Sequence, residues 1–359
     1  MPQIAGFRAG LWNAKNELER DPSRAVYRYA QAFTAGSRTL VRKSFFCAVQ
    51  LSPFSERVVR PHEATDPGAR ERAIAGIKKV GMHTDAVLAG FRDKADEVER
   101  LFRGVDNGRP AVELTTPDGT NHKLWRVSSA EIIGKLRPLF APKPLHVLDG
   151  HARWEGMLAY RDSLGDMPMY SSGNYAFACL VNLDDPALAP GPRHRIVRVD
   201  VKKEDALATP YFIVEKLPGA AADIGKQFAA LADTVAHQPA FVCVFAGDAD
   251  AYKLTLKPEV SPVAEGVSVN RVIQKYDPLV CDRLFLAKVA PNAPLETTLD
   301  AAKIRGEGIT LGVVMKPLSV DQIVKVDEVG EVLPFGSTAF FPQVARMLAY
   351  VVDPNEDLV

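Results

Sequence analysis

A turn between a predicted strand and a predicted helix constrains the fold of this chain most. The apolar run 144–148 is typical of a buried strand, and it leads directly into Asp149 and Gly150. Over residues 153–164, apolar side chains recur one helical turn apart. A helix N-terminus presents N–H groups without partners and the positive end of the helix dipole, so anions bind there. The segment therefore predicts an α/β arrangement with an anion-binding turn.

The side chains of this turn suit a phosphate group. Gly150 lets an anion approach the backbone, Arg153 can contact phosphate oxygens with two nitrogens, and the imidazole of His151 titrates near neutrality. The residues alone leave open a second interpretation, in which Asp149 only caps the helix and Arg153 lies on the surface. We take His151 and Arg153 as catalytic candidates. The expected nucleotide-binding set is Asp149, Gly150, His151, Ala152, Arg153 and Trp154, the last as a core or pocket-wall residue.

The rest of the chain alternates between strand and helix patterns, as expected for an α/β (α+β) protein. A length of 359 residues indicates about two domains, and the pattern restarts near residue 205, so we expect domains at 1–205 and 206–359. The expected helices are 10–20, 69–79, 93–103, 130–136, 153–164, 219–236, 277–286, 320–326 and 342–351. The expected strands are 25–33, 39–49, 86–91, 123–127, 144–148, 175–183, 194–199, 241–246, 252–256 and 311–315, with 58–63 a short strand or loop.

Charge and cysteine usage exclude several classes of protein. Lys+Arg and Asp+Glu are equal at 44 each, so no overall field attracts DNA or an anionic membrane. The 4 cysteines are far apart in apolar runs, which indicates buried thiols in a reducing compartment and neither zinc nor disulfides. Apolar stretches such as 240–246 are far shorter than the ~20 residues that span a bilayer, and no signal peptide is apparent. We therefore expect a soluble, cytoplasmic protein without a DNA or membrane partner.

Three further clusters are candidate sites. Glu63, which follows Pro61 and His62, can act as a general base towards a hydroxyl or hold Mg²⁺ beside phosphates. The alternative is that His62 and Glu63 are a solvated pair at the end of a strand. His194 and Arg195 can clamp a carboxylate or phosphate, or belong to a surface basic cluster. The run 184–186 can ligate a metal but is more typical of a turn. The sequence templates of P-loop, Rossmann, zincin and hydrolase-elbow sites are absent.

Several of these segments occur in a fixed order and resemble the bacterial and archaeal domain-of-unknown-function 1015 family. The resemblance extends from about residue 21 to residue 351. The motifs that carry it are Pro61-His62-Glu63-Ala64-Thr65, Asp149-Gly150-His151-Ala152-Arg153-Trp154-Glu155, Tyr160-Arg161-Asp162, His194-Arg195 and Pro334-Phe335-Gly336-Ser337-Thr338-Ala339-Phe340-Phe341-Pro342-Gln343.

That family is in turn similar to the ParB/sulfiredoxin-like superfamily, which includes the free-serine kinases. The resemblance implies a ParB/sulfiredoxin-like nucleotide-binding core followed by a C-terminal α+β part. It also implies that the turn holds nucleotide phosphates and that Glu63 deprotonates a substrate hydroxyl. Sulfiredoxin has its cysteine at the position of His151, so sulfinic-acid reduction is not expected here. The substrate-binding residues that it implies are His62, Thr65, His194 and Arg195.

The implied activity is that of a kinase-like phosphotransferase acting on a small hydroxylated metabolite, serine or an analogue. The implied cofactor is ATP or ADP, with CTP as the alternative, together with Mg²⁺; no residue is assigned as a metal ligand. The family's second histidine is Ala152 here, and its C-terminal lysines are replaced by Phe335-Gly336 and Gln343. These departures keep a non-catalytic nucleotide-binding switch open as an alternative. A metal-dependent phosphoesterase using Asp149, His151 and Asp184 is another, and a homo-oligomer is compatible with the sequence.

Overall fold

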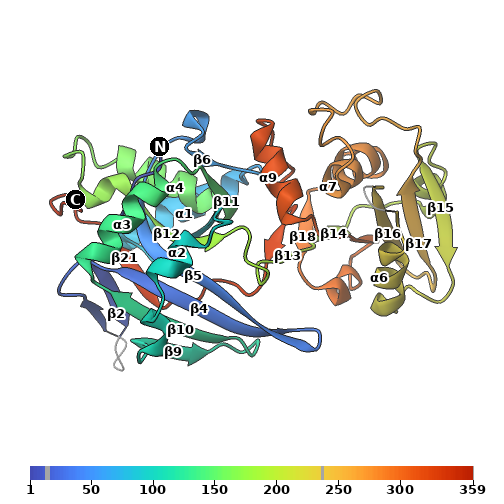
Figure 1. Cartoon of the computed structure of the whole chain (residues 1–359). Coiled ribbons are helices and arrows are strands. Elements are labelled where there is room, and N and C mark those ends of the chain that lie inside the picture. Colours follow the sequence, from blue (N-terminus) through green and yellow to red (C-terminus); the bar gives the residue numbers. More distant parts are fainter. Residues whose placement is uncertain (13–16, 236–237, 359) are drawn as a thin grey trace. The chain divides into compact units, whose positions relative to one another are not determined.

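The computed structural model describes residues 1–12, 17–235 and 238–358. It has the mixed α/β architecture that the sequence predicted, with several sheets and interspersed helices (Figure 1). The described chain divides into two compact units, one of residues 1–189 with 340–359 and one of residues 190–339. The boundaries between these units lie at 189/190 and 339/340, and not near residue 205 as expected. The reason is that the strand at 194–197 pairs within the second unit and the C-terminal strand pairs within the first.

A large mixed sheet forms the centre of the first unit. It is built around the predicted hairpin, in which Tyr27 to Ala35 pair with Arg38 to Phe46 in antiparallel register. The strand order is β6 (Val59–Arg60), β11 (Leu145–Asp149), β8 (Val87–Phe91), β12 (Tyr175–Asn182), β5 (Arg38–Gln50), β4 (Val26–Ala35), β10 (Asn121–Val127) and β9 (Val112–Thr115), and β1 (Ile4–Ala5) also pairs with β5.

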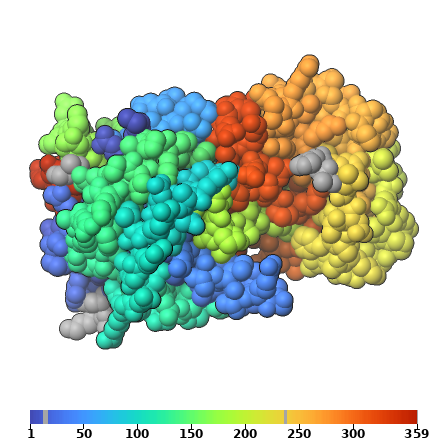
Figure 2. Space-filling model, in the orientation of Figure 1, coloured from blue at the N-terminus to red at the C-terminus, as the bar shows by residue number. Residues whose placement is uncertain are grey.

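Both faces of this sheet are covered by other elements. Successive residues of a strand point to opposite sides, so Phe45 and Phe46 pack on different faces. On one face, Phe45 packs against Phe102 and Phe140, which follow α2 (Glu97–Leu101) and end α3 (Ala130–Phe140). Figure 2 shows the segments around α2 and α3, in cyan and green, as a continuous layer over one face of the unit. On the other face, Phe46 stacks on Phe177, which contacts Tyr350 of the C-terminal strand.

The strand that contains Tyr350 belongs to a small sheet where the sequence suggested helices. Its order is β3 (Leu18–Arg20), β2 (Ala9–Trp12), β21 (Leu348–Val351) and β7 (Met82–His83). The predictions of helices at 10–20 and 342–351 are therefore wrong for the described residues of these ranges. Residues 13–16 lie outside the described residues. Pairing between distant segments, such as Gly10 with Ala349 and Tyr350 with His83, overrides the local pattern.

Helices α1 (Pro67–Val80) and α4 (His151–Asp162) pack closely together in the first unit. A Cβ on Gly156 of α4 would lie 2.9 Å from the Cβ of Ala73 in α1, so only glycine allows this approach. The ends of both helices follow the sequence closely. Asp66 caps α1 by accepting a hydrogen bond from the backbone N–H of Ala69, and α4 begins at His151, within the predicted turn 149–153 and two residues before the expected helix start.

The second unit contains its own sheet and apolar core. The strand order is β15 (Phe212–Leu217), β17 (Ala251–Leu256), β16 (Ala240–Phe245), β19 (Leu311–Val314), β14 (His194–Val197) and β18 (Glu296–Thr298). The helical segments are α5 (Lys203–Leu207), α6 (Ile224–Ala232), α7 (Asp277–Leu279), the π-helical η4 (Val280–Leu286), α8 (Ala287–Val289), the 3-10 helix η5 (Ala301–Ile304) and α9 (Val320–Glu328). The predicted helix 219–236 thus shortens to α6, and residue 236 lies outside the described residues.

The four cysteines are divided equally between the two units. Cys47, Cys179, Cys243 and Cys281 are all free and buried, as predicted. Burial raises the pKa of the Cys179 thiol to about 11, so it is protonated at neutral pH. No helix in the described ranges is long and apolar enough to cross a membrane.

Candidate functional site

Parallel pairing of β6 with β11 brings two distant motifs to one edge of the large sheet. Val59 pairs with Leu145 and Arg60 with His146, so the two strands run in the same direction, and β11 continues for three residues beyond this pairing. The chain leaves β6 into Pro61-His62-Glu63 and leaves β11 into Gly150. Ligands of α/β proteins commonly bind outside the carboxyl ends of parallel strands. This edge is therefore the candidate site.

A histidine pair joins the two motifs. The backbone N–H of His62 donates to Nε2 of His151 at 3.4 Å, and the two rings pack edge to face with their centroids 4.8 Å apart. Nδ1 of His62 donates to the carbonyl oxygen of Val147 at 2.7 Å. That carbonyl lies where the β11–β8 register shifts between Val147 and Asp149, an irregularity that opens the ladder beside the site.

These contacts fix the protonation state of His151. Its ring is buried, and burial together with the neighbouring His62 and Arg153 holds its pKa well below the ordinary value for histidine. The imidazole is therefore neutral at pH 7. Because Nε2 accepts from the His62 N–H, the ring proton is on Nδ1. His151 thus acts as a fixed polar group that holds the Pro61-His62-Glu63 segment, and it contributes no positive charge.

The turn itself leaves the N-terminus of α4 without a side-chain cap. Gly150 is the N-cap residue and has φ +99°, a conformation that glycine adopts readily and other residues rarely do. As a glycine, this N-cap residue has no side chain that could accept a hydrogen bond from the N–H groups of the first turn. Asp149 does not cap the helix, since its Oδ2 accepts from the Arg153 guanidinium at 2.9 Å instead. The alternative in which Asp149 caps α4 is therefore wrong.

Arg153 folds back over the turn. A Cβ added at Gly150 would lie 2.6 Å from Nε of Arg153, so the guanidinium rests directly against the glycine backbone. Nε is buried and, among the described residues, has no hydrogen-bond partner. A buried donor without an acceptor is costly, and a phosphate oxygen would satisfy it. The turn thus combines helix N–H groups, a cation and an unmatched donor in one place.

The remaining predicted residues of the first unit differ in how they can contribute. Glu63 is 8% exposed, and its Oε2 lies 3.9 Å from Nε2 of His62. Thr65 is half-buried in the loop before α1, and Ala152 is half-buried in the first turn of α4. Trp154 is only 1% exposed, and its Nε1 donates to the carbonyl of Ser52 at 3.0 Å. It is therefore a core residue that holds α4 in place.

His194 and Arg195 lie on β14 of the second unit, and their contacts within that unit favour a structural role. Arg195 is fully buried and forms a two-nitrogen ion pair with Asp282 of η4, both bonds being 2.8 Å long. It also donates to the carbonyl of Gly336 at 2.9 Å. His194 is buried and accepts from the backbone N–H of Met315 at 3.1 Å. Their predicted substrate-binding role stays a prediction.

Sequence reasoning missed Asp282, the acidic partner of Arg195. A buried arginine needs a counter-charge, but the pattern of the segment around Asp282 indicates only a helix. The structure makes it a π-helical turn, a feature often found near functional positions.

The residues proposed for a metal-dependent phosphoesterase do not come together. β12 is parallel to β8, whereas β11 is antiparallel to β8, so β12 and β11 end at opposite edges of the sheet. Asp184 follows β12 and pairs with Arg92 at 2.6 Å, at the edge opposite Asp149 and His151. Within the described residues, no three His, Cys, Asp or Glu side chains gather as metal ligands.

No curated protein matches this chain. Among solved structures, C-terminally truncated SbnI from Staphylococcus aureus is similar at 12% identity and a TM-score of 0.45, over 87% of this chain and 90% of that one. A conserved hypothetical protein from Pyrococcus furiosus is similar at 14% identity and 0.40, over 84% and 92%. A free serine kinase in complex with AMP is similar at 13% identity and 0.41, over 83% and 86%.

A family model described as "Protein of unknown function (DUF1015)" matches residues 8–282. The match includes the Pro61-His62-Glu63 segment, the Asp149–Arg153 turn and the His194-Arg195 strand. It agrees with the family resemblance that these motifs carried in the sequence. The chain therefore belongs to the DUF1015 family.

Proposed function

We propose that this protein is a nucleotide-dependent phosphotransferase that acts on a small hydroxylated metabolite. The observation that supports this most is the meeting of β6 and β11, which brings Glu63 to the same sheet edge as the uncapped N-terminus of α4. One motif offers a carboxylate for a proton and the other offers donors for phosphate oxygens. Phosphoryl transfer needs chiefly positioning and charge stabilisation, and this edge contains groups for both.

The phosphates of the nucleotide bind at the turn in this proposal. The N–H groups of the first turn of α4 point towards the incoming anion, and the dipole of this 12-residue helix favours negative charge there. Gly150 allows the close approach. Arg153 exchanges the Asp149 carboxylate for phosphate oxygens, which also gives its buried Nε an acceptor.

Glu63 accepts the proton of the substrate hydroxyl as that oxygen attacks the terminal phosphorus of ATP. The new O–P bond forms as the bridging P–O bond breaks, ADP leaves, and the electron pair of the broken bond stays on ADP. With ADP as donor, AMP leaves in the same way. His62 and His151 hold the loop that carries Glu63 against the turn. Serine is the first substrate to test, because the motif resemblance points to it.

Mg²⁺ would accompany the nucleotide in this reaction. It usually keeps several waters and takes one or two carboxylates beside the phosphate oxygens. Asp149, which Arg153 releases on binding phosphate, is the carboxylate that would hold the ion in this proposal, whereas Glu63 accepts the proton. When bound, the ion would neutralise charge on the phosphates; the binding, orienting and proton-accepting steps above belong to the protein.

Calorimetric titration tests the binding step. We expect ATP, ADP or CTP with Mg²⁺ to bind the full-length protein, and Arg153→Ala to weaken binding about 10-fold to 100-fold, since charge-assisted bonds contribute about 1.5–3 kcal/mol. Arg72→Ala is the matched control, because the Arg72 side chain is 75% exposed on α1. Absence of binding by every nucleotide, or equal losses in both variants, would overturn the proposal.

Glu63→Gln tests the catalytic step. We expect this variant to bind nucleotide as the unchanged protein does but to lose phosphoryl transfer to serine and related hydroxyl compounds, followed by ³¹P NMR. Glu113→Gln, at an exposed pair with Lys123, should leave both properties unchanged. Nucleotide binding without transfer to any hydroxyl compound by the unchanged protein would refute the catalytic role and favour the non-catalytic switch.

A further inference from the structure

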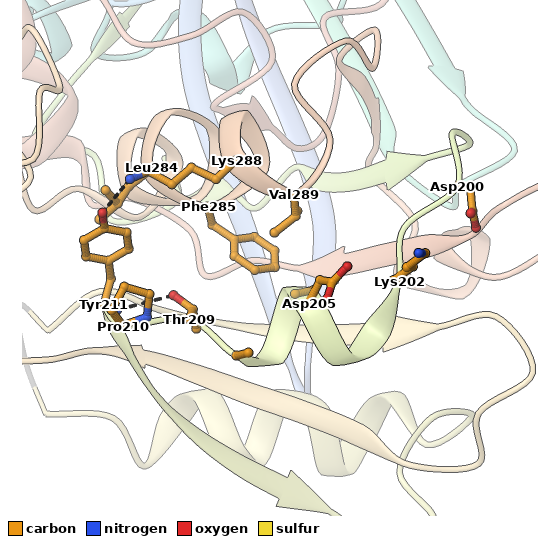
Figure 3. Close-up of a pocket in the computed structure, with 12 residues that line it drawn as sticks. Asp200, Lys202, Asp205, Thr209, Pro210, Tyr211, Leu284, Phe285, Lys288 and Val289 are labelled. Atoms are coloured by element: carbon orange, nitrogen blue, oxygen red, sulfur yellow. Dashed lines mark hydrogen bonds between the residues drawn. The ribbon is translucent and has the colours of Figure 1, made fainter.

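The second unit contains a pocket of about 370 Å³ that no part of the proposed reaction uses. It lies between α5 with the segment that follows it and the helical run of η4 and α8 (Figure 3). All lining residues fall between 200 and 289, within one compact unit. The volume is in the range of small-molecule sites. The pocket is therefore separate in sequence and in residues from the Asp149–Arg153 turn.

One end of the pocket is cationic and aromatic. Lys288 of α8 donates to the hydroxyl of Tyr211 at 2.5 Å, and its Nζ lies 4.2 Å from the centre of the Tyr211 ring. The phenol is a neutral partner, so the ammonium charge has no acidic partner among the described residues. This end can therefore bind an anionic group such as a carboxylate.

The other end of the pocket is net acidic. In Figure 3, Asp205, Lys202 and Asp200 follow one another on the side of Phe285 that is away from Tyr211, with Asp205 nearest to Phe285. Across the part of the chain that the structure describes, none of these three side chains has an ion-pair partner, whereas the neighbouring Lys203 pairs with Asp248 at 3.0 Å. Two carboxylates against one ammonium leave a net negative charge at this end. It can therefore bind an ammonium group.

The middle of the pocket is apolar. Phe285 and Val289 lie between the two charged ends, on successive turns of the same helical run (Figure 3). Phe285 belongs to the apolar core of the unit, which makes this part of the wall rigid. A ligand that fits this sequence of surfaces has an ammonium and an anionic group at opposite ends of an apolar stretch.

We propose that this pocket binds an elongated zwitterion, of the class of short peptides with free ends and ω-amino acids. The anionic end contacts Lys288 and the Tyr211 hydroxyl, the apolar stretch lies on Phe285, and the ammonium end contacts Asp200 and Asp205. An α-amino acid has its two charges on adjacent atoms and does not reach both ends. This inference does not rest on the proposed nucleotide site, because no residue of the first unit lines the pocket.

A length series tests the ligand class. The full-length protein is titrated by calorimetry with 4-aminobutanoate, 6-aminohexanoate, 8-aminooctanoate and trialanine, and with hexanoate, hexylamine and leucine as probes that lack one charge or the separation between charges. We expect affinity to rise with charge separation, and each singly charged probe to bind about fivefold or more weakly than 6-aminohexanoate, as for the loss of one partly exposed ion pair. Equal affinity for all probes, or no binding by any zwitterion, would overturn the proposal.

Paired variants locate the site. Lys288→Met and Asp205→Asn should each weaken binding of the best zwitterion about fivefold, the first without changing affinity for hexylamine and the second without changing affinity for hexanoate. Lys203→Met is the control for Lys288→Met, and Glu204→Gln is the control for Asp205→Asn. Each control changes the net charge by the same amount as its partner variant, at a position that does not line the pocket. Equal effects of a variant and its control would show that general charge is responsible and would refute the site.

Discussion

Replacing Gly150 by alanine tests how the turn is built. Gly150 has φ +99°, and the new Cβ would lie 2.6–3.1 Å from Nε, Nη2 and Cζ of Arg153. The variant therefore imposes a strained backbone on a residue with a side chain, and it also pushes the guanidinium off the turn. Because the atoms in the way are the far end of a flexible side chain, we expect Arg153 to move and α4 to stay folded.

The expected loss of stability follows from three terms. A left-handed conformation costs an alanine about 1–2 kcal/mol, and the loss of the partly exposed Asp149–Arg153 pair adds about 0.2–1 kcal/mol. The lower entropy of the unfolded chain offsets about 0.4–1 kcal/mol. The net loss is about 1–2 kcal/mol, which lowers the Tm by roughly 3–6 °C for a unit of this size.

Gly36→Ala is the matched control for this variant. Gly36 lies at the tip of the β4–β5 hairpin with φ +62°, and nothing lies within 4 Å of an added Cβ. Alanine at this position therefore incurs only the cost of the left-handed backbone conformation. Thermal unfolding and nucleotide titration of both variants should show comparable losses in Tm, with nucleotide binding impaired only in Gly150→Ala. If Gly150→Ala binds nucleotide like the unchanged protein, the close approach at the turn has no role in binding.

Three further predictions concern charge and burial. Asp149→Asn removes the internal competitor for the Arg153 guanidinium, so without Mg²⁺ it should bind ADP about 2-fold to 5-fold more tightly by calorimetry; weaker binding would contradict the competition. Burial lowers the pKa of His83 to about 3, so between pH 6.5 and 3 the unfolded chain binds a proton at His83 that the folded chain does not. Acidification through this range therefore lowers the free energy of unfolding, by at most about 1.4 kcal/mol per pH unit, whereas His83 has no such effect above pH 6.5. His83→Phe, which keeps a ring against Tyr350, should therefore flatten the loss of Tm between pH 6.5 and 4, and an unchanged slope would rule out this assignment. Asp282→Asn leaves the buried Arg195 without its counter-charge and should cost about 3–5 kcal/mol in chemical denaturation, and a loss below 1 kcal/mol would show that the pair is dispensable.

Local sequence patterns predicted the elements whose periodicity and caps are self-contained. The hairpin of β4 and β5 follows from two strand-forming runs around Ala35-Gly36-Ser37, and α3 begins at the predicted cap Ser129. The strand and the glycine of the Asp149–Arg153 turn also appear where the sequence places them, and the helix that follows begins two residues earlier than expected, because the switch from strand to helix periodicity is encoded within a few residues.

Elements that depend on distant partners were not predictable in the same way. The segments 10–20 and 342–351 carry apolar spacing compatible with helices, but each becomes a strand because the other supplies its hydrogen-bonding partner. A strand has no internal hydrogen bonds, so its identity depends on a neighbour that the local sequence does not reveal. The counter-charge of Arg195, at Asp282, was missed for the same reason.

The features of the candidate site also divide into those that the local sequence determines and those that depend on distant partners. The sequence by itself determined the turn, with a glycine at the one position where φ is +99° and an arginine one helical turn further on. Only the tertiary structure decided that the strand before Glu63 pairs in parallel with the strand before the turn, β6 with β11. It also decided that His151 is neutral and Trp154 is core, because burial depends on what packs around a side chain. Residue types specify the chemistry that is available, whereas long-range pairing and packing specify which groups meet and in which protonation state.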